Sequence, residues 1–434
     1  METTQDSKIY HIDKTRRVLL LIVLTLLYVL CFADRQIFSI ALEPMKVALG
    51  LSDTDLGSIQ AVFNIGLGVL AIPGSILVDR WSRRKTIGIM AILWSIATFS
   101  TGLCRNFVQL IIPRAFVGIG EAGYFPGGSG WLSVVFSKDN RGRVLNIFGI
   151  GPVIGIVVGS VVGGMMIAKT NDWTSPFWIF AIPGVILGVI VFFFKDYATV
   201  EGKREGGKGE NYLADWFGLF KIKAFRIIII GQVFWALFYF TFLGWFAVLL
   251  MRGYDLDTGK AGLIVGGTAL FGAICVPFGG WLTDIWHKRN KAGRAYMMVV
   301  VQSLNVVSLL LAILLFGISL PVYICIIALS AVATSMITGT VSTMISDVVP
   351  VKHRASGVAW NVVFNYLFGA SLGSWLVGVA SDAFGGGANG LKLAFICIAP
   401  ALIIAFVIHL LNLRGSYVED SARCSDQVFD ERKA

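Results

Sequence analysis

Long runs of apolar residues, separated by short polar segments, occupy most of this chain. Twelve of these runs are long enough to cross a lipid bilayer as helices, since about 20 helical residues span its hydrocarbon core. They cover roughly residues 18–42, 57–78, 86–104, 108–136, 144–168, 176–194, 227–251, 261–283, 295–316, 321–349, 356–384 and 391–413. The pattern therefore predicts an all-α membrane protein with twelve transmembrane helices.

The composition agrees with a lipid environment. Hydrophobic residues make up 56% of the 434 residues and charged residues only 14%, and the mean hydropathy is +0.77. Soluble domains are nearer a quarter charged. The 49 glycines suit close packing of helices in a membrane. The six cysteines show no pairing framework and are best interpreted as small apolar side chains.

The basic residues predict the orientation of the chain in the membrane. With a cytoplasmic N-terminus, 28 of the 36 Lys and Arg residues fall inside, 6 outside and two within helices. This bias follows the positive-inside rule and places both termini in the cytoplasm. The net charge of +10 is thus explained by topology and anionic lipid headgroups, and it does not indicate a nucleic-acid partner.

One charged, Gly-rich segment divides the runs six and six. We predict an N-terminal six-helix bundle over residues 1–194, a cytoplasmic linker over 195–226, and a C-terminal six-helix bundle with a cytoplasmic tail over 227–434. The linker is expected to carry one surface helix over residues 212–220.

An internal repeat supports this division. The loop GSILVDRWSRRK, residues 74–85, and the loop GGWLTDIWHKRNK, residues 279–291, each place an Asp at a helix end with two basic residues four and five positions later. The first loop resembles the signature of the major facilitator superfamily between spans 2 and 3, although Ser75 and Ser82 stand where glycines are usual. The resemblance implies two six-helix bundles and a secondary transporter, not an enzyme.

Two branches of that superfamily share further motifs with this chain. Asp34–Arg35, the spacing from Arg114 to Glu121 and the stretch GEAGYFPG resemble the anion:cation symporters, which take up sugar acids and other organic anions. The stretch DRQIFSIALEPMK resembles the bacterial spinster-like branch, whose eukaryotic relatives move lysolipids and sphingolipids. The first resemblance implies uptake and the second implies export, and GPVIG at residues 151–155 weakly favours export because it resembles part of an antiporter motif.

Four ionisable residues within predicted helices are the main candidates for function. Each costs roughly 2.5–3.5 kcal/mol in a membrane helix, and such residues are functional by default. Arg114 and Glu121 are seven residues apart and therefore face the same side of a helix. We expect Arg35 to attract an anionic substrate, Asp34 and Glu121 to carry coupling protons, and Arg114 to partner Glu121 or contact the anion. The alternative is that Asp34–Arg35 and Arg114–Glu121 are fixed structural ion pairs.

Uncharged polar residues complete the candidate site. They recur on one helix face each, at i, i+4 or a related spacing, although amides inside lipid more often join helices than line cavities. The predicted substrate-binding residues are Arg35, Gln60, Asn64, Arg114, Trp235, Tyr239, Asn361 and Asn365. The predicted gating residues, at inner helix ends where they could clamp the two halves together, are Asp79, Arg83, Arg84, Asp284, Lys288 and Arg289.

The sequence carries no pattern that requires a cofactor or a metal. Its four His residues lack ligand spacing, and the G-x-G-x-x-G at residues 118–123 lies inside a predicted span rather than after a strand. The charged residues and the resemblance to the anion:cation symporters together predict a monomeric, proton-coupled symporter of the bacterial inner or plasma membrane. Its partners would be a small organic anion, protons and membrane lipid. The alternative is a spinster-like exporter of lysolipid or amphipathic drug.

Overall fold

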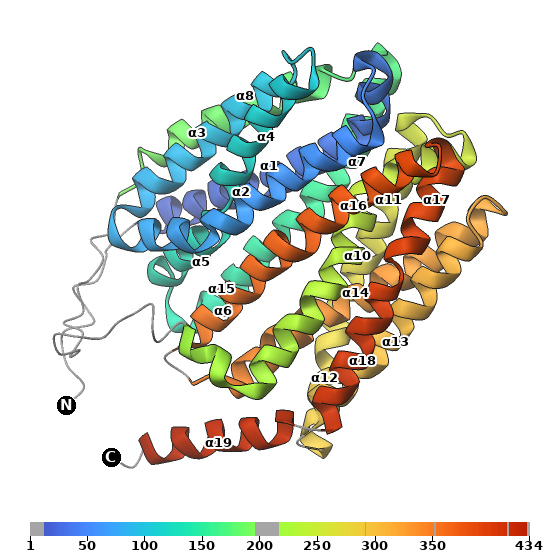
Figure 1. The fold of residues 1–434 in the computed structure, drawn as a ribbon. Coiled ribbons are helices and arrows are strands. Elements are labelled where there is room, and N and C mark those ends of the chain that lie inside the picture. Colours follow the sequence, from blue (N-terminus) through green and yellow to red (C-terminus); the bar gives the residue numbers. More distant parts are fainter. Residues whose placement is uncertain (1–12, 196–216, 291, 351–352, 415, 432–434) are drawn as a thin grey trace.

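The described chain is helical throughout. The computed structural model describes residues 13–195, 217–290, 292–350, 353–414 and 416–431, and it has no strand among them. Most helices run along one common direction and pack side by side (Figure 1). The all-α expectation is therefore confirmed, whereas the count of twelve membrane spans stays a prediction.

The helix bounds follow the apolar runs closely. The first half contains α1 (Lys14–Leu49), α2 (Asp53–Arg80), α3 (Arg83–Thr101), α4 (Phe107–Glu121), α5 (Tyr124–Val135), α6 (Lys138–Gly149), α7 (Gly151–Thr170) and α8 (Ser175–Val191). The second half contains η2 (Leu219–Lys221), α10 (Lys223–Tyr254), α11 (Thr258–Ile274), α12 (Val276–Arg289), α13 (Gly293–Leu314), α14 (Leu320–Val348), α15 (Arg354–Phe364), η4 (Asn365–Ala370), α16 (Ser371–Ala383), α17 (Gly387–Ile398), α18 (Pro400–Arg414) and α19 (Ser416–Glu431). Within the described residues, eight helical stretches are long and apolar enough to cross a membrane, and α8 and α11 are shorter apolar helices.

Several predicted helices are interrupted in the structure. The run at 108–136 forms α4 and α5, and the run at 261–283 forms α11 and α12. The run at 391–413 likewise forms α17 and α18. Two of the second segments, α12 and α18, carry a proline in their first turn, where the missing N–H of proline is tolerated. The run at 356–384 passes through η4, a π-helical segment over Asn365–Ala370. Hydropathy alone does not register such interruptions, because the apolar character continues across them.

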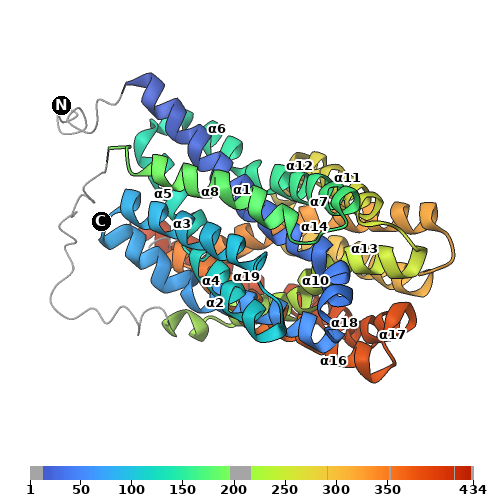
Figure 2. The same cartoon turned by 90° about the horizontal axis from the view of Figure 1, so that it is seen from above.

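Two close helix crossings join the halves of the chain, α2 with α16 and α7 with α11. Figures 1 and 2 both show α7 and α11 side by side. The backbones approach so closely that a Cβ atom added at Gly378 would overlap the carbonyl oxygen of Asp53, and one at Gly262 would overlap that of Ser160. Small residues at such crossings allow the dispersion contacts that drive helix association in lipid.

The C-terminal helix α19 lies across the ends of other helices (Figure 1). Its Tyr417 hydroxyl donates to Asp347 in α14 at 2.6 Å, and Asp347 is also paired with Arg294 in α13. Asp420 of α19 accepts the backbone N–H of Ala224, in the first turn of α10, at 2.9 Å. This contact satisfies one of the unpaired donors that every helix start exposes. The chain end is thereby bound to the second half.

The predicted linker falls largely outside the described residues, which omit 196–216. Of the surface helix predicted over 212–220, the described part ends in the short 3₁₀ turn η2. The division into 1–194, 195–226 and 227–434 therefore stays a prediction.

Candidate functional site

The four ionisable residues of α1 and α4 form two crossed ion pairs. Arg114 Nη1 lies 2.9 Å from Asp34 Oδ2, and Arg35 Nε lies 2.7 Å from Glu121 Oε2. The sequence suggested pairs within one helix, Asp34 with Arg35 or Arg114 with Glu121, and the structure corrects this. Adjacent residues of a helix point about 100° apart, so Asp34 and Arg35 each reach a different partner on α4.

Further contacts hold each pair. Thr98 of α3 donates its hydroxyl to Asp34 Oδ1 at 2.7 Å. The Arg114 guanidinium carbon lies 4.0 Å from the ring centre of Phe38. Arg35 donates to the Tyr366 hydroxyl at 3.1 Å, and its guanidinium carbon lies 4.5 Å from the ring centre of Phe32. Aromatic faces stabilise cations, and they do so more strongly away from water.

The two pairs differ in how far they are exposed. The side chains of Arg114 and Asp34 are 2% and 4% exposed, and that of Glu121 is fully buried. Arg35 is 17% exposed. Arg35 is therefore the member of the four that a ligand can reach most easily.

A cavity of about 100 Å³ lies against these residues, enclosed by α1, α2, α4, α7, α10 and η4. The residues that line it are Phe32, Arg35, Gln36, Phe38, Ser39, Gln60, Phe63, Asn64, Arg114, Ile156, Phe240, Leu243, Gly244 and Tyr366. Both halves of the chain thus contribute, and the lining combines two arginines and three amides with aromatic rings. Typical ligand sites have this mixture of apolar walls and few polar groups.

Half of the predicted substrate-binding residues line this cavity, namely Arg35, Gln60, Asn64 and Arg114. Trp235, Tyr239, Asn361 and Asn365 are not part of the lining. Trp235 stacks on Tyr239 with ring centres 4.7 Å apart and donates to Asn305 at 3.3 Å. The second half instead contributes Phe240, Leu243, Gly244 and Tyr366.

The π-helical segment η4 contributes the cavity residue Tyr366. Asn361 lies in α15 and Asn365 is the first residue of η4, so their i, i+4 spacing holds, but neither lines the cavity. π-turns are frequent at functional sites. Tyr366, which follows Asn365, accepts a hydrogen bond from Arg35. Gln36, next to Arg35, is a lining residue that the sequence analysis did not select.

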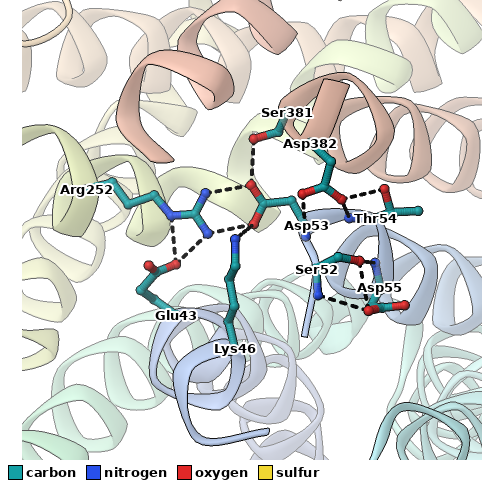
Figure 3. Close-up of polar contacts among 9 residues, drawn as sticks. All are labelled: Glu43, Lys46, Ser52, Asp53, Thr54, Asp55, Arg252, Ser381 and Asp382. Atoms are coloured by element: carbon teal, nitrogen blue, oxygen red, sulfur yellow. Dashed lines mark hydrogen bonds and ion pairs between the residues drawn. The ribbon is translucent and has the colours of Figure 1, made fainter. Parts of the chain in front are cut away.

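A second group of charges, the distal cluster, lies where α1 ends and α2 begins, which we call the distal end. It comprises Glu43, Lys46, Asp53, Thr54, Arg252, Ser381 and Asp382 (Figure 3). Arg252 of α10 binds both carboxylate oxygens of Asp53, at 2.7 and 2.8 Å, and also lies 2.6 Å from Glu43. Lys46 lies 2.5 Å from Asp53, and Ser381 donates to Asp53 at 2.6 Å.

Asp382 of α16 caps the start of α2 from the other half of the chain. Its carboxylate accepts the backbone N–H groups of Asp53 at 3.0 Å and Thr54 at 2.7 Å, and the Thr54 hydroxyl at 2.6 Å. An anion at a helix N-terminus satisfies unpaired donors and opposes the helix dipole. The sequence analysis missed this cluster because Asp53 is 199 residues from Arg252 and 329 residues from Asp382 in the chain.

The predicted gating residues lie toward the opposite helix ends. Arg84 donates to the backbone carbonyl oxygens of Phe192 and Phe194, both at 3.2 Å, rather than to a carboxylate. Arg83 is half-buried, and Lys288 and Arg289 are exposed. The side chains of Asp79 and Asp284 lie outside the described part of the structure. A gate at this end therefore stays a prediction.

Comparison with known proteins identifies the family. The model of the Major Facilitator Superfamily matches residues 24–367 and 261–423. The chain therefore belongs to the major facilitator superfamily and is a transporter rather than an enzyme. It is an integral, multi-pass membrane protein. The resemblance that the loop motifs indicated is confirmed.

Relatives include a sugar-acid transporter and a spinster protein. A probable L-galactonate transporter of Escherichia coli strain K12 is 26% identical over 295 residues, which cover 64% of this chain and 63% of that protein, less than two thirds of its length. Protein spinster homolog 1 of Xenopus laevis is 25% identical over 392 residues, covering 86% of this chain and 74% of that protein.

Among solved structures, a bacterial homologue of the human lysosomal transporter Spinster, in an inward-facing and unoccupied conformation, matches with a TM-score of 0.81. The match covers 94% of this chain and 99% of that chain, at 22% identity. At this identity the likeness supports the fold alone.

The burial of the Arg114–Asp34 pair generates a stability prediction. Arg114→Met should lower the free energy of unfolding by about 3–5 kcal/mol, because it leaves the Asp34 carboxylate buried without its cation. The double variant Arg114→Met/Asp34→Asn should recover much of this loss. Thermal unfolding of the purified protein in detergent measures both.

Lys260 supplies the matched control, since its pair with Asp257 is exposed. Lys260→Met should change the stability by less than about 1 kcal/mol. If Arg114→Met/Asp34→Asn is as unstable as Arg114→Met, the unpaired Asp34 carboxylate is not the cause of the lost stability.

Proposed function

We propose that this chain is a proton-coupled symporter that takes up a small organic anion, such as a sugar acid or another carboxylate, by alternating access. Its twelve spans would form six-helix bundles from residues 1–194 and 227–434, joined by the cytoplasmic linker 195–226. Both termini would be cytoplasmic, as the positive-inside bias favours. A single copy would suffice for transport, because both walls of the cavity come from one chain.

The observation that carries this proposal is the position of Arg35. It lines the cavity, it is partly exposed, and it is bound to the buried carboxylate of Glu121. A substrate carboxylate that enters the cavity would compete with Glu121 for the same guanidinium group. Arg suits this exchange because its planar donors bind one carboxylate as well as another.

Competition for Arg35 couples the anion to a proton. When Arg35 turns to the substrate, Glu121 loses its cation while it stays buried, and burial favours the neutral form of a carboxyl group. Glu121 would then bind a proton, so that the proton and the anion enter together. Asp34, held by Arg114 and Thr98, is the second proposed proton site.

Other residues would orient the substrate. Gln60, Asn64 and Arg114 line the same cavity as Arg35 and could contact the hydroxyl groups or the second end of a sugar acid. We also propose substrate contacts from four residues of the second half that do not line this cavity, namely Trp235, Tyr239, Asn361 and Asn365. L-galactonate, the sugar acid in the name of one relative, is a suitable test substrate.

Arg35→Ala should abolish galactonate counterflow in proteoliposomes. The loss should be at least about 100-fold, because truncating one partner of a buried charge pair costs several kcal/mol. Radiolabelled galactonate exchange into vesicles loaded with galactonate measures this. Lys260→Ala, at an exposed position, should keep the wild-type rate. Intact counterflow in Arg35→Ala would remove this residue from the site.

Glu121→Gln should separate exchange from accumulation. The amide cannot carry a proton, so uptake driven by an inward proton gradient should fall to the level without a gradient, while counterflow persists. Both assays use the same vesicles with and without the gradient, and Asp257→Asn, at an exposed helix start, is the control. Persistent gradient-driven uptake in Glu121→Gln would show that Glu121 is not the coupling site.

A second candidate function is export of a lysolipid or an amphipathic drug. Two observations favour it: the similarity to protein spinster homolog 1 over most of the chain, and the apolar rings of Phe32, Phe63 and Phe240 in the cavity wall. Galactonate and lysophosphatidylcholine distinguish the two functions. Thermal stabilisation and transport with galactonate alone support the symporter, whereas an effect of the lysolipid alone supports the exporter.

A further inference from the structure

The distal cluster joins the two halves of the chain through opposite charges on both sides. The first half supplies the carboxylates of Glu43 and Asp53, and the second half supplies the Arg252 cation. Conversely, the second half supplies the Asp382 carboxylate, and the first half supplies the N-terminal donors of α2. Each contact is charge-assisted, and such hydrogen bonds contribute about 1.5–3 kcal/mol.

Asp53 has partners in both halves. It is fully buried and binds Arg252 and Ser381 of the second half. It also binds Lys46, which lies on α1 in its own half. If the halves separate at this end, Asp53 loses Arg252 but keeps Lys46. It is then not left as an isolated charge, which would cost several kcal/mol.

The start of α2 is arranged in the same way. Asp382 caps it from the other half, and a capping box formed by Ser52 and Asp55 caps it from its own half. Asp55 N–H donates to the Ser52 hydroxyl at 3.0 Å, and Ser52 N–H donates to Asp55 at 2.9 Å. The helix would therefore keep its cap when Asp382 moves away.

Water reaches this region from the surface. A groove of about 650 Å³ is lined by Glu43, Arg252 and Asp257, among others. Arg252 and Glu43 would therefore be hydrated as soon as they part. Hydration lowers the free energy of the separated charges and makes the contact reversible.

We propose that the distal cluster is a reversible gate that holds the distal end closed, with Arg252 and Asp382 stabilising the closed state and Lys46 stabilising the open state. The proposal rests on the alternating access proposed above, but not on the identity of the anion. Arg252 and Lys46 bind the same carboxylate, that of Asp53, yet they are expected to have opposite effects on the equilibrium between the closed and open states.

The opposite effects follow from the partners that Asp53 keeps in each variant. Arg252→Met removes the contacts of Asp53 and Glu43 across the halves but leaves Lys46 on Asp53 in both states. The closed state therefore loses more stability than the open state. Lys46→Met leaves Arg252 and Ser381 on Asp53 in the closed state. In the open state, Lys46→Met leaves Asp53 with neither cation, so the open state loses more stability than the closed state.

Distances between spin labels across the distal end test this without any substrate. The labels are placed at Leu103→Cys and Ile318→Cys, which are 54% and 72% exposed, in full-length protein whose six native cysteines are replaced. Ile318 follows Gly317, which donates its N–H to Tyr254 at the end of α10. One label therefore reports on each half.

The ratio of long to short distances should rise at least about tenfold in Arg252→Met, because more than one charge-assisted bond across the halves is lost. It should also rise in Asp382→Asn and fall in Lys46→Met. Asp257→Asn is the matched control: this aspartate caps its own helix at the same end and should leave the ratio unchanged.

The outcomes separate the gate from the transport mechanism. Shifts of the same sign in Lys46→Met and Arg252→Met, or an equal shift in Asp257→Asn, would overturn the gate while alternating access stands. One fixed distance in every variant would overturn both. Since Asp382→Asn keeps the shape of the side chain, it tests the proposal even if Arg252→Met fails to fold.

Discussion

The burial of four charges between α1 and α4 is the constraint on which the site depends. In a low-dielectric interior each charge needs a partner with good geometry, because desolvation otherwise exceeds the Coulomb gain. The crossed pairs Arg114–Asp34 and Arg35–Glu121 meet this requirement. They also link the side chains of α4 to those of α1, and the two arginines line the same cavity. The aromatic rings around them exclude water and strengthen both interactions.

Contacts between the halves of the chain are of two physical kinds. At the crossings of α2 with α16 and of α7 with α11, glycines bring backbones together, and these contacts depend on shape. In the distal cluster, long charged side chains reach across, and those contacts depend on charge. In the proposed mechanism, sliding at the first kind and re-pairing at the second would allow one chain to adopt two stable arrangements.

The fold could be predicted from the sequence because membrane helices appear in it as long apolar runs. Nearly every such run coincides with a described helix. The charged candidates Arg35 and Arg114 could be found because an ionisable residue in such a run is rare. Their partners could not, since adjacent Asp34 and Arg35 look like a pair until the tertiary fold brings Arg114 and Glu121 of α4 within reach. Tyr366 and Arg252 were missed because they meet Arg35 and Asp53 only through the tertiary fold.

The crossed pairs have an electrical consequence. Two arginines and two carboxylates sum to zero, so the empty site carries no net charge across the membrane. A site that gains one monovalent anion together with one proton is again neutral. With that stoichiometry the membrane potential, worth about 2.3 kcal/mol per charge at 100 mV, would not act on either loaded or empty carrier. Accumulation would then follow the pH difference alone, and a dianion carried with a single proton would have to move against the voltage.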